Sequence, residues 1–192
     1  TDHLEPHIAE EALRILERCG KKVEIVTGVD SCRAPISKGL LREAKLRLEP
    51  GIRRLNEIAS RGLPIVGLEP SAALGFRDEI PDLFPNSPLQ DMARTVAAKL
   101  QLFEEYFLTL ESIPFSNQAA GKLLVHGHCH AKALIGMVPL LAALKRLPGA
   151  EVIDLNTGCC GMAGSFGYEK EHYDISMEIA DPSLFPALRA HP

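Results

Sequence analysis

Short β-branched or apolar runs alternate with longer amphipathic segments along this chain of 192 residues. In the longer segments apolar residues recur every three or four positions, which predicts helices, whereas the short runs are typical of strands. Strands that alternate with helices of ten or more residues indicate parallel sheets with helices on their faces. The sequence therefore predicts an α/β fold.

The same order of strand, turn and helix occurs in both halves of the chain, on either side of a linker at residues 111–121. We therefore expect two pseudo-symmetric Rossmann-like lobes with short, mostly parallel sheets, one over residues 1–112 and one over residues 118–192. The predicted helices cover residues 6–19, 37–60 (with a break at 50–51), 89–110, 131–147, 169–180 and 184–190, and the predicted strands cover residues 22–27, 64–68, 122–126 and 151–155.

Four of the five cysteines lie in predicted turns between a strand and a helix: Cys32, Cys129, Cys159 and Cys160. Ligands of open α/β sheets bind beyond the carboxyl ends of the strands, so we expect these four sulfurs to lie near one another in a cleft. The fifth, Cys19, falls on the apolar stripe of the first predicted helix, and we expect it in the core of the first lobe.

The adjacent pair Cys159 and Cys160 is poorly placed for a mutual disulfide, because neighbouring Cα atoms are closer than disulfide partners usually are. Their sulfurs either bind a metal ion or an iron–sulfur cluster as thiolates, or pack as small buried hydrophobes. Glycines on both sides and the HGHCH run at residues 126–130 favour the first interpretation.

The histidines of that run allow two interpretations. One of His126, His128 and His130 supplies a metal ligand, or it is instead a histidine held by hydrogen bonds near a helix start. Glu69, at the end of a predicted strand, either faces the cleft or belongs to the start of the next helix.

Composition excludes several classes of function. The net charge is −4 with both signs interspersed, so nucleic acid is not an expected partner. The longest uncharged apolar run, residues 133–144, contains a proline and is too short for an integral membrane segment. Five cysteines without framework spacing predict reduced thiols and a cytoplasmic location.

Two motifs, HGHCHAKAL at residues 126–134 and GCCGMAGSFGY at residues 158–168, resemble the second half of the cysteine-rich CCG module. That module is shared by heterodisulfide reductase subunits, by the iron–sulfur subunit of glycolate oxidase and by the C-terminal parts of large FAD-linked 2-hydroxyacid dehydrogenases. The likeness is strongest to the dehydrogenases, and it extends to ISKGLL at residues 36–41 and GLEPS at residues 67–71.

The resemblance implies a module that passes electrons from a reduced flavin to an acceptor. Its partner would be a flavin domain of the same polypeptide or of a partner subunit, which would hold the FAD. The implied ligands of an iron–sulfur cluster or a metal ion are Cys32, Cys129, Cys159, Cys160 and His128.

The chain departs from the module pattern in its first half and at its end. Cys32 stands alone where a Cys-Cys-Gly is expected, and Ala72 stands where a cysteine usually follows Glu-Pro-Ser. A last cysteine segment, a Cys-x-x-Cys ferredoxin run and a flavin-binding segment are not in the sequence. The first lobe is therefore expected to be degenerate and the second to be incomplete at its C-terminus.

Three functions remain from the sequence. The favoured one is an electron-transfer component of an oxidoreductase that is not catalytic alone and has no catalytic residue in this chain. The second is a zinc-binding or purely structural lobe without a redox role. The third is a thiol enzyme with Cys159 or Cys160 as nucleophile beside a histidine base.

Overall fold

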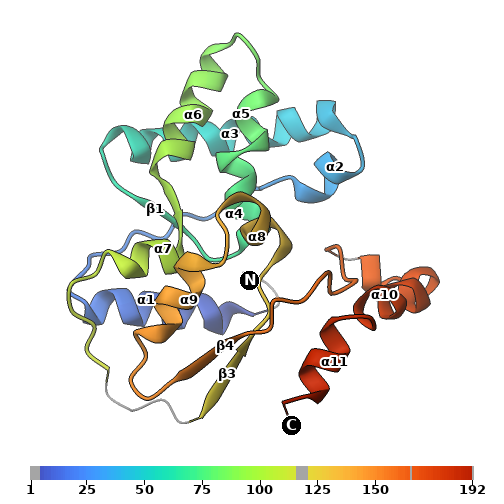
Figure 1. Ribbon diagram of the computed structural model, residues 1–192. Coiled ribbons are helices and arrows are strands. Elements are labelled where there is room, and N and C mark those ends of the chain that lie inside the picture. The colour runs from blue at the N-terminus through green and yellow to red at the C-terminus, as the bar shows by residue number, and fades with distance from the viewer. Residues whose placement is uncertain (1–4, 116–120, 165, 192) are drawn as a thin grey trace. The chain divides into compact units, whose positions relative to one another are not determined.

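The computed structural model describes residues 5–115, 121–164 and 166–191, and Figure 1 shows its helices and strands. The chain divides into two compact units, Thr1–Pro114 and Phe115–Pro192. Both units combine helices with a two-stranded parallel sheet, so the predicted α/β class is confirmed. The division falls within the predicted linker; that the units are a degenerate and an incomplete lobe of the module stays a prediction.

Unit 1 contains a pair of parallel strands that lie far apart in sequence. Ile65 of the first strand pairs with Leu100 of the second, and Gly67 pairs with Leu102. Its elements are α1 (Pro6–Arg18), α2 (Arg33–Ser37), α3 (Leu41–Ser60), β1 (Ile65–Gly67), α4 (Pro70–Arg77), α5 (Glu79–Asp82), α6 (Pro88–Lys99), β2 (Leu100–Leu102) and α7 (Phe103–Leu108).

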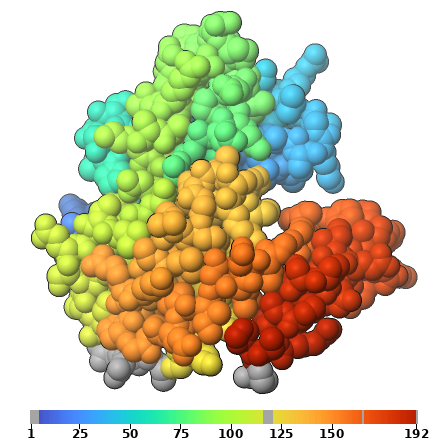
Figure 2. All heavy atoms as spheres, in the orientation of Figure 1, coloured from blue at the N-terminus to red at the C-terminus, as the bar shows by residue number. Residues whose placement is uncertain are grey.

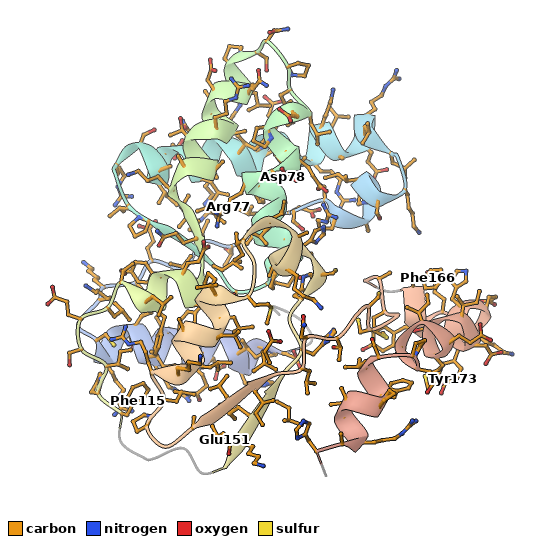
Figure 3. All side chains as sticks on the ribbon, in the orientation of Figure 1. Arg77, Asp78, Phe115, Glu151, Phe166 and Tyr173 are labelled. Atoms are coloured by element: carbon orange, nitrogen blue, oxygen red, sulfur yellow. The ribbon has the colours of Figure 1, made fainter. Side chains whose placement is uncertain are left out.

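The core of unit 1 lies where α3 and α6 pack against each other (Figure 1). Leu48 and Ile52 of α3 and Val96 of α6 are fully buried. Each such aliphatic side chain contributes about 1.5–3 kcal/mol relative to leaving it exposed. Arg77 of α4, labelled in Figure 3, pairs with Glu105 of α7 at 2.6 Å. This ion pair ties together the helices that follow β1 and β2.

Unit 2 is built around a second parallel strand pair, in which Val125 lies opposite Asp154. The helix α9 packs against β4 in this unit. The elements of unit 2 are β3 (Lys122–Val125), α8 (Cys129–Leu134), α9 (Val138–Lys145), β4 (Glu151–Asp154), the 3-10 helices η1 (Phe166–Tyr168) and η2 (Lys170–His172), α10 (Tyr173–Ala180) and α11 (Leu184–Arg189).

The structure corrects several expected elements. The helix predicted over residues 89–110 is interrupted by β2, and the helix predicted over residues 131–147 is divided into α8 and α9 near Gly136. Residues 22–27 form no strand, and Ile25 is 67% exposed there. Conversely, α3 continues through Pro50, which lies on its exposed side, where the missing N–H is least costly.

Cys19 does not lie in the core as expected. It follows the last residue of α1 as the C-cap and is half-buried, while Ala12 and Leu16 form the buried stripe of that helix. Among the described residues, no helix combines the length and the apolar character that a bilayer crossing requires.

Candidate cysteine site

The two motif-bearing loops of unit 2 meet at one edge of its sheet. Because β3 and β4 are parallel and Val125 is in register with Asp154, the residues after both strands emerge at the same edge. A hydrogen bond of 2.7 Å between His126 Nδ1 and Thr157 Oγ1 joins the loops directly. The predicted position of the motifs, beyond the carboxyl ends of parallel strands, is thus observed in this unit.

Three side chains anchor the two residues that precede the cysteine pair. His126 binds the Thr157 hydroxyl, and Lys132 Nζ donates to the Thr157 carbonyl oxygen at 2.7 Å. The Gly158 N–H donates to Ser183 Oγ at 2.9 Å. The sequence alone does not single out Lys132, Thr157 and Ser183, because only the folded chain brings these side chains to the loop. These contacts hold in place the backbone that directly precedes Cys159.

The cysteines of this unit are accessible at the sheet edge. Cys159 is exposed, Cys160 is half-buried, and Cys129 is exposed as the first residue of α8. The Cys159 sulfur accepts a hydrogen bond from the Gly161 N–H at 3.3 Å. Backbone N–H groups that point at sulfur are among the features that tune thiolate-bound iron–sulfur clusters. The accessible thiols and the N–H group that donates to the Cys159 sulfur therefore fit a thiolate-bound metal centre in their chemistry.

The glycines of the second motif are required by the close approach of α10. A Cβ at Gly161 would lie 2.8 Å from the carbonyl carbon of Ser176, and Gly161 has a φ of +81°. A Cβ at Gly167 would lie 2.5 Å from Ser176 Oγ. Phe166 stacks on His172 with ring centroids 3.9 Å apart, and Figure 3 labels Phe166 and Tyr173 at the two ends of the segment that leads into α10. The glycines of this motif thus let α10 pack directly against the loop that carries the cysteines.

His128 acts as a helix cap in this structure. Its Nδ1 accepts the His130 N–H at 3.2 Å at the start of α8, and the two imidazole rings stack with centroids 5.8 Å apart. The His128 side chain therefore caps α8, and ligation by His128 stays a prediction.

Cys32 differs from the cysteines of unit 2. It is 1% exposed and adopts a left-handed conformation, with φ at 51°, before α2. Its backbone N–H donates to Asp30 Oδ1 at 2.7 Å, and Asp30 forms an ion pair with Arg47. Burial and the negative charge of Asp30 raise the pKa of the Cys32 thiol to about 11. These features oppose ligation through a thiolate. The role of Cys32 as a ligand stays a prediction.

Neighbouring residues in unit 1 are also held by polar contacts. The carboxylate of Glu69 accepts the N–H groups of Ser71 and Ala72 at 3.0 and 2.6 Å, so it caps α4. Arg33 pairs with Glu79 of α5. Polar contacts of Arg33 and Glu69 therefore hold the turn after residues 22–27 and the turn after β1.

Within the described residues, no group of three or more His, Cys, Asp or Glu side chains is arranged to hold a metal ion. The thiols of unit 2 fit such a centre in chemical type and accessibility, but the residues that the structure describes do not assemble a complete ligand set. The expected gathering of all four sulfurs involves both units and stays a prediction.

His126 provides a pH-dependent test of the loop anchor. Burial and the nearby charge of Lys132 lower the pKa of His126 below its usual range. The unfolded chain, with a histidine pKa near 6.5, therefore binds more protons, so the free energy of unfolding should fall as the pH drops below about 6.5. We expect His126→Asn, which keeps a hydrogen-bonding group near Thr157, to reduce this pH dependence in urea titrations. An unchanged slope would show that other groups cause it.

Comparison with known proteins gives distant relatives across nearly the whole chain. The chain is 26% identical over 183 residues to a subunit of the anaerobic glycerol-3-phosphate dehydrogenase of Escherichia coli strain K12, covering 92% of this chain and 45% of that protein. It is 26% identical to D-2-hydroxyglutarate dehydrogenase of the same strain over 194 residues, which cover 100% of this chain and 18% of that protein. The enzyme of the same name from Pantoea ananatis matches at 26% identity over 193 residues, again 18% of its length.

The chain is a homologue of these dehydrogenase proteins. The predicted resemblance to dehydrogenases, among them proteins named D-2-hydroxyglutarate dehydrogenase, is thereby confirmed, and it supports an oxidoreductase component. The chain spans less than half the length of the glycerol-3-phosphate dehydrogenase protein and about a fifth of the D-2-hydroxyglutarate dehydrogenases. No protein-family model matches the chain, and no solved structure matches it significantly.

Proposed function

We propose that this chain is the cysteine-rich electron-transfer module of an FAD-linked 2-hydroxyacid oxidoreductase, and that it passes electrons from a reduced flavin to an acceptor. The observation that carries the proposal is the meeting of the two cysteine loops at one sheet edge, held together by the bond between His126 and Thr157. The relatives named D-2-hydroxyglutarate dehydrogenase support the substrate class.

The residues that would hold the redox centre are Cys129, Cys159 and Cys160, with His128 as a further candidate. A bound iron–sulfur cluster would supply one-electron chemistry. The chain contributes accessible thiols and an N–H···S hydrogen bond from Gly161, while the anchors on Thr157 orient the loop.

The electron donor in this proposal is a flavin domain of the same polypeptide or of a partner subunit. The relative from the anaerobic glycerol-3-phosphate dehydrogenase is itself named as one of the subunits of that enzyme, which supports a multi-subunit arrangement. Reduced cysteines without disulfide partners favour a cytoplasmic location for the assembly.

A zinc-binding or structural lobe is the second candidate. The burial of Cys32 favours it, because unit 2 then supplies only the thiols of Cys129, Cys159 and Cys160, and a zinc ion readily takes a histidine as its fourth ligand. A thiol enzyme has less support. The hydrogen bond shown at the Cys159 sulfur comes from a backbone N–H and not from a histidine base.

Anaerobic reconstitution separates these functions. The purified chain is incubated with ferrous iron and sulfide, or with zinc alone, desalted, and analysed for metal and acid-labile sulfide. We expect iron and sulfide to be retained together, because thiolates are the preferred protein ligands of such clusters. Retention of zinc without labile sulfide would favour the structural lobe, and retention of neither would end the electron-transfer proposal for this chain.

A further inference from the structure

A groove of about 490 Å³ lies between α3 and the segment that leads into α6. Its apolar part includes Phe84 and Leu46, and Leu46 is 70% exposed although it belongs to a long helix. We call this feature the basic groove. It is lined by Arg42, Lys45, Leu46, Glu49, Arg53, Phe84, Ser87, Pro88 and Leu89.

Two positive charges of the basic groove are not neutralised. Arg53 pairs with Glu49 at 2.7 Å, so these two charges cancel. In the part of the chain that the structure describes, Arg42 and Lys45 form no ion pair, and Lys45 Nζ lies 6.0 Å from the centre of the Phe84 ring. Cations beside exposed apolar side chains, on a chain with a net charge of −4, are suited to an acidic and apolar occupant.

The free face of α10 has the complementary character. Ser176 and Ala180 are buried, and the same helix exposes Ile175 at 48% and Ile179 at 42%. Acidic residues at positions 174 and 178 are one helical turn apart and lie next to these isoleucines on the helix surface. We call residues 174, 175, 178 and 179 the acidic face; Figure 2 shows the surface of this C-terminal region in red.

The charges of the acidic face also lack partners. Within the described residues no cation forms an ion pair with Asp174 or Glu178; the ion pairs nearest in sequence involve Glu169 and Asp181. The chain therefore displays two unpaired cations around exposed apolar side chains in one place, and two unpaired carboxylates around exposed apolar side chains in another.

We propose that the acidic face of α10 in one copy of the chain docks into the basic groove of a second copy. A pair in which each copy gives its α10 and receives that of the other makes this contact twice. Two contacts of one helix each bury less area than a standard stable interface, so the dimer is weak. Because its charges are exposed at the rim, added salt weakens it further. This inference is independent of the proposed redox function.

Sedimentation velocity of the purified chain tests the proposal by charge reversal. We expect a concentration-dependent dimer in about 0.05 M NaCl that dissociates in about 0.5 M NaCl. Lys45→Glu alone and Glu178→Lys alone should each weaken the dimer by roughly tenfold or more, because attraction across the contact becomes repulsion. The double variant restores opposite charges and should recover most of the affinity.

Lys38→Glu is the matched control, because it makes the same change in net charge at an exposed site outside the basic groove. It should leave the dissociation constant within about twofold of the parent value. Circular dichroism confirms that each variant is folded. A chain that is monomeric under all conditions, or a dimer that Lys45→Glu and Lys38→Glu weaken equally, would overturn the proposal.

Discussion

Gly161→Ala is expected to lower the free energy of unfolding of unit 2 by at least about 3 kcal/mol, a large share of the roughly 5–15 kcal/mol that stabilise an ordinary domain. The new methyl group would lie 2.8 Å from the carbonyl carbon and 2.9 Å from the hydroxyl oxygen of Ser176, a backbone contact that cannot be relieved by a rotamer change. The left-handed backbone at φ +81° adds strain for any residue with a Cβ. Urea unfolding followed by circular dichroism measures the loss.

Gly164→Ala is the matched control for this prediction. Gly164 also has a left-handed backbone, with φ at +69°, but a Cβ there would meet no atom within 4 Å. This variant should lose only about 1–2 kcal/mol from the backbone conformation. The difference between the two variants isolates the close approach of α10. Equal losses would mean that the packing of Ser176 against Gly161 contributes little.

The glycines that follow the cysteine pair show which features of a motif the sequence predicts and which depend on the fold. The sequence correctly indicated a cysteine turn at the end of a strand, because β-branched residues before it and glycines after it are local signals. It did not indicate why each glycine is needed. Gly161 and Gly167 are required by a helix that begins at Tyr173, and that contact exists only after the chain has folded back.

Tertiary pairing explains the elements that were predicted wrongly. Leu100, Phe103 and Phe107 continue a helical spacing from α6, yet residues 100–102 form a strand, because Leu100 finds Ile65 as a parallel partner. Residues 22–27 have strand-forming composition, but no described strand pairs with them. A strand is stable only with a neighbour, so its presence cannot be inferred from its own residues alone.

The site was predictable in its position and less so in its ligands. Parallel strand order places Cys129 and the Cys159 loop at one edge, as expected. The environment of Cys32 depends on Asp30 and Arg47, two charged residues that pair only in the folded unit. The spacing of Cys32 in the sequence therefore carries no signal of its burial or of its raised pKa.

Cys129→Ser and Cys160→Ser are each expected to lower the iron retained after anaerobic reconstitution by roughly tenfold or more. Serine is a harder and far less acidic ligand than cysteine, and changes in the outer shell alone cost roughly 10–100-fold in metal affinity. Both cysteines are accessible enough to bind as thiolates without unfolding the unit, since Cys129 is exposed and Cys160 is half-buried. Iron and acid-labile sulfide per chain, measured after desalting, give the result.

Cys32→Ser serves as the comparison, because its thiol is buried and its pKa is raised to about 11. We expect this variant to keep the iron content of the parent chain while losing about 1–3 kcal/mol of stability, since a hydroxyl replaces a thiol in a packed site. Cys19→Ser, at a half-buried helix cap, should change neither quantity strongly. If Cys32→Ser loses iron as fully as Cys129→Ser, the turn of unit 1 must open so that Cys32 binds the metal. Both units of the chain then supply ligands to the centre.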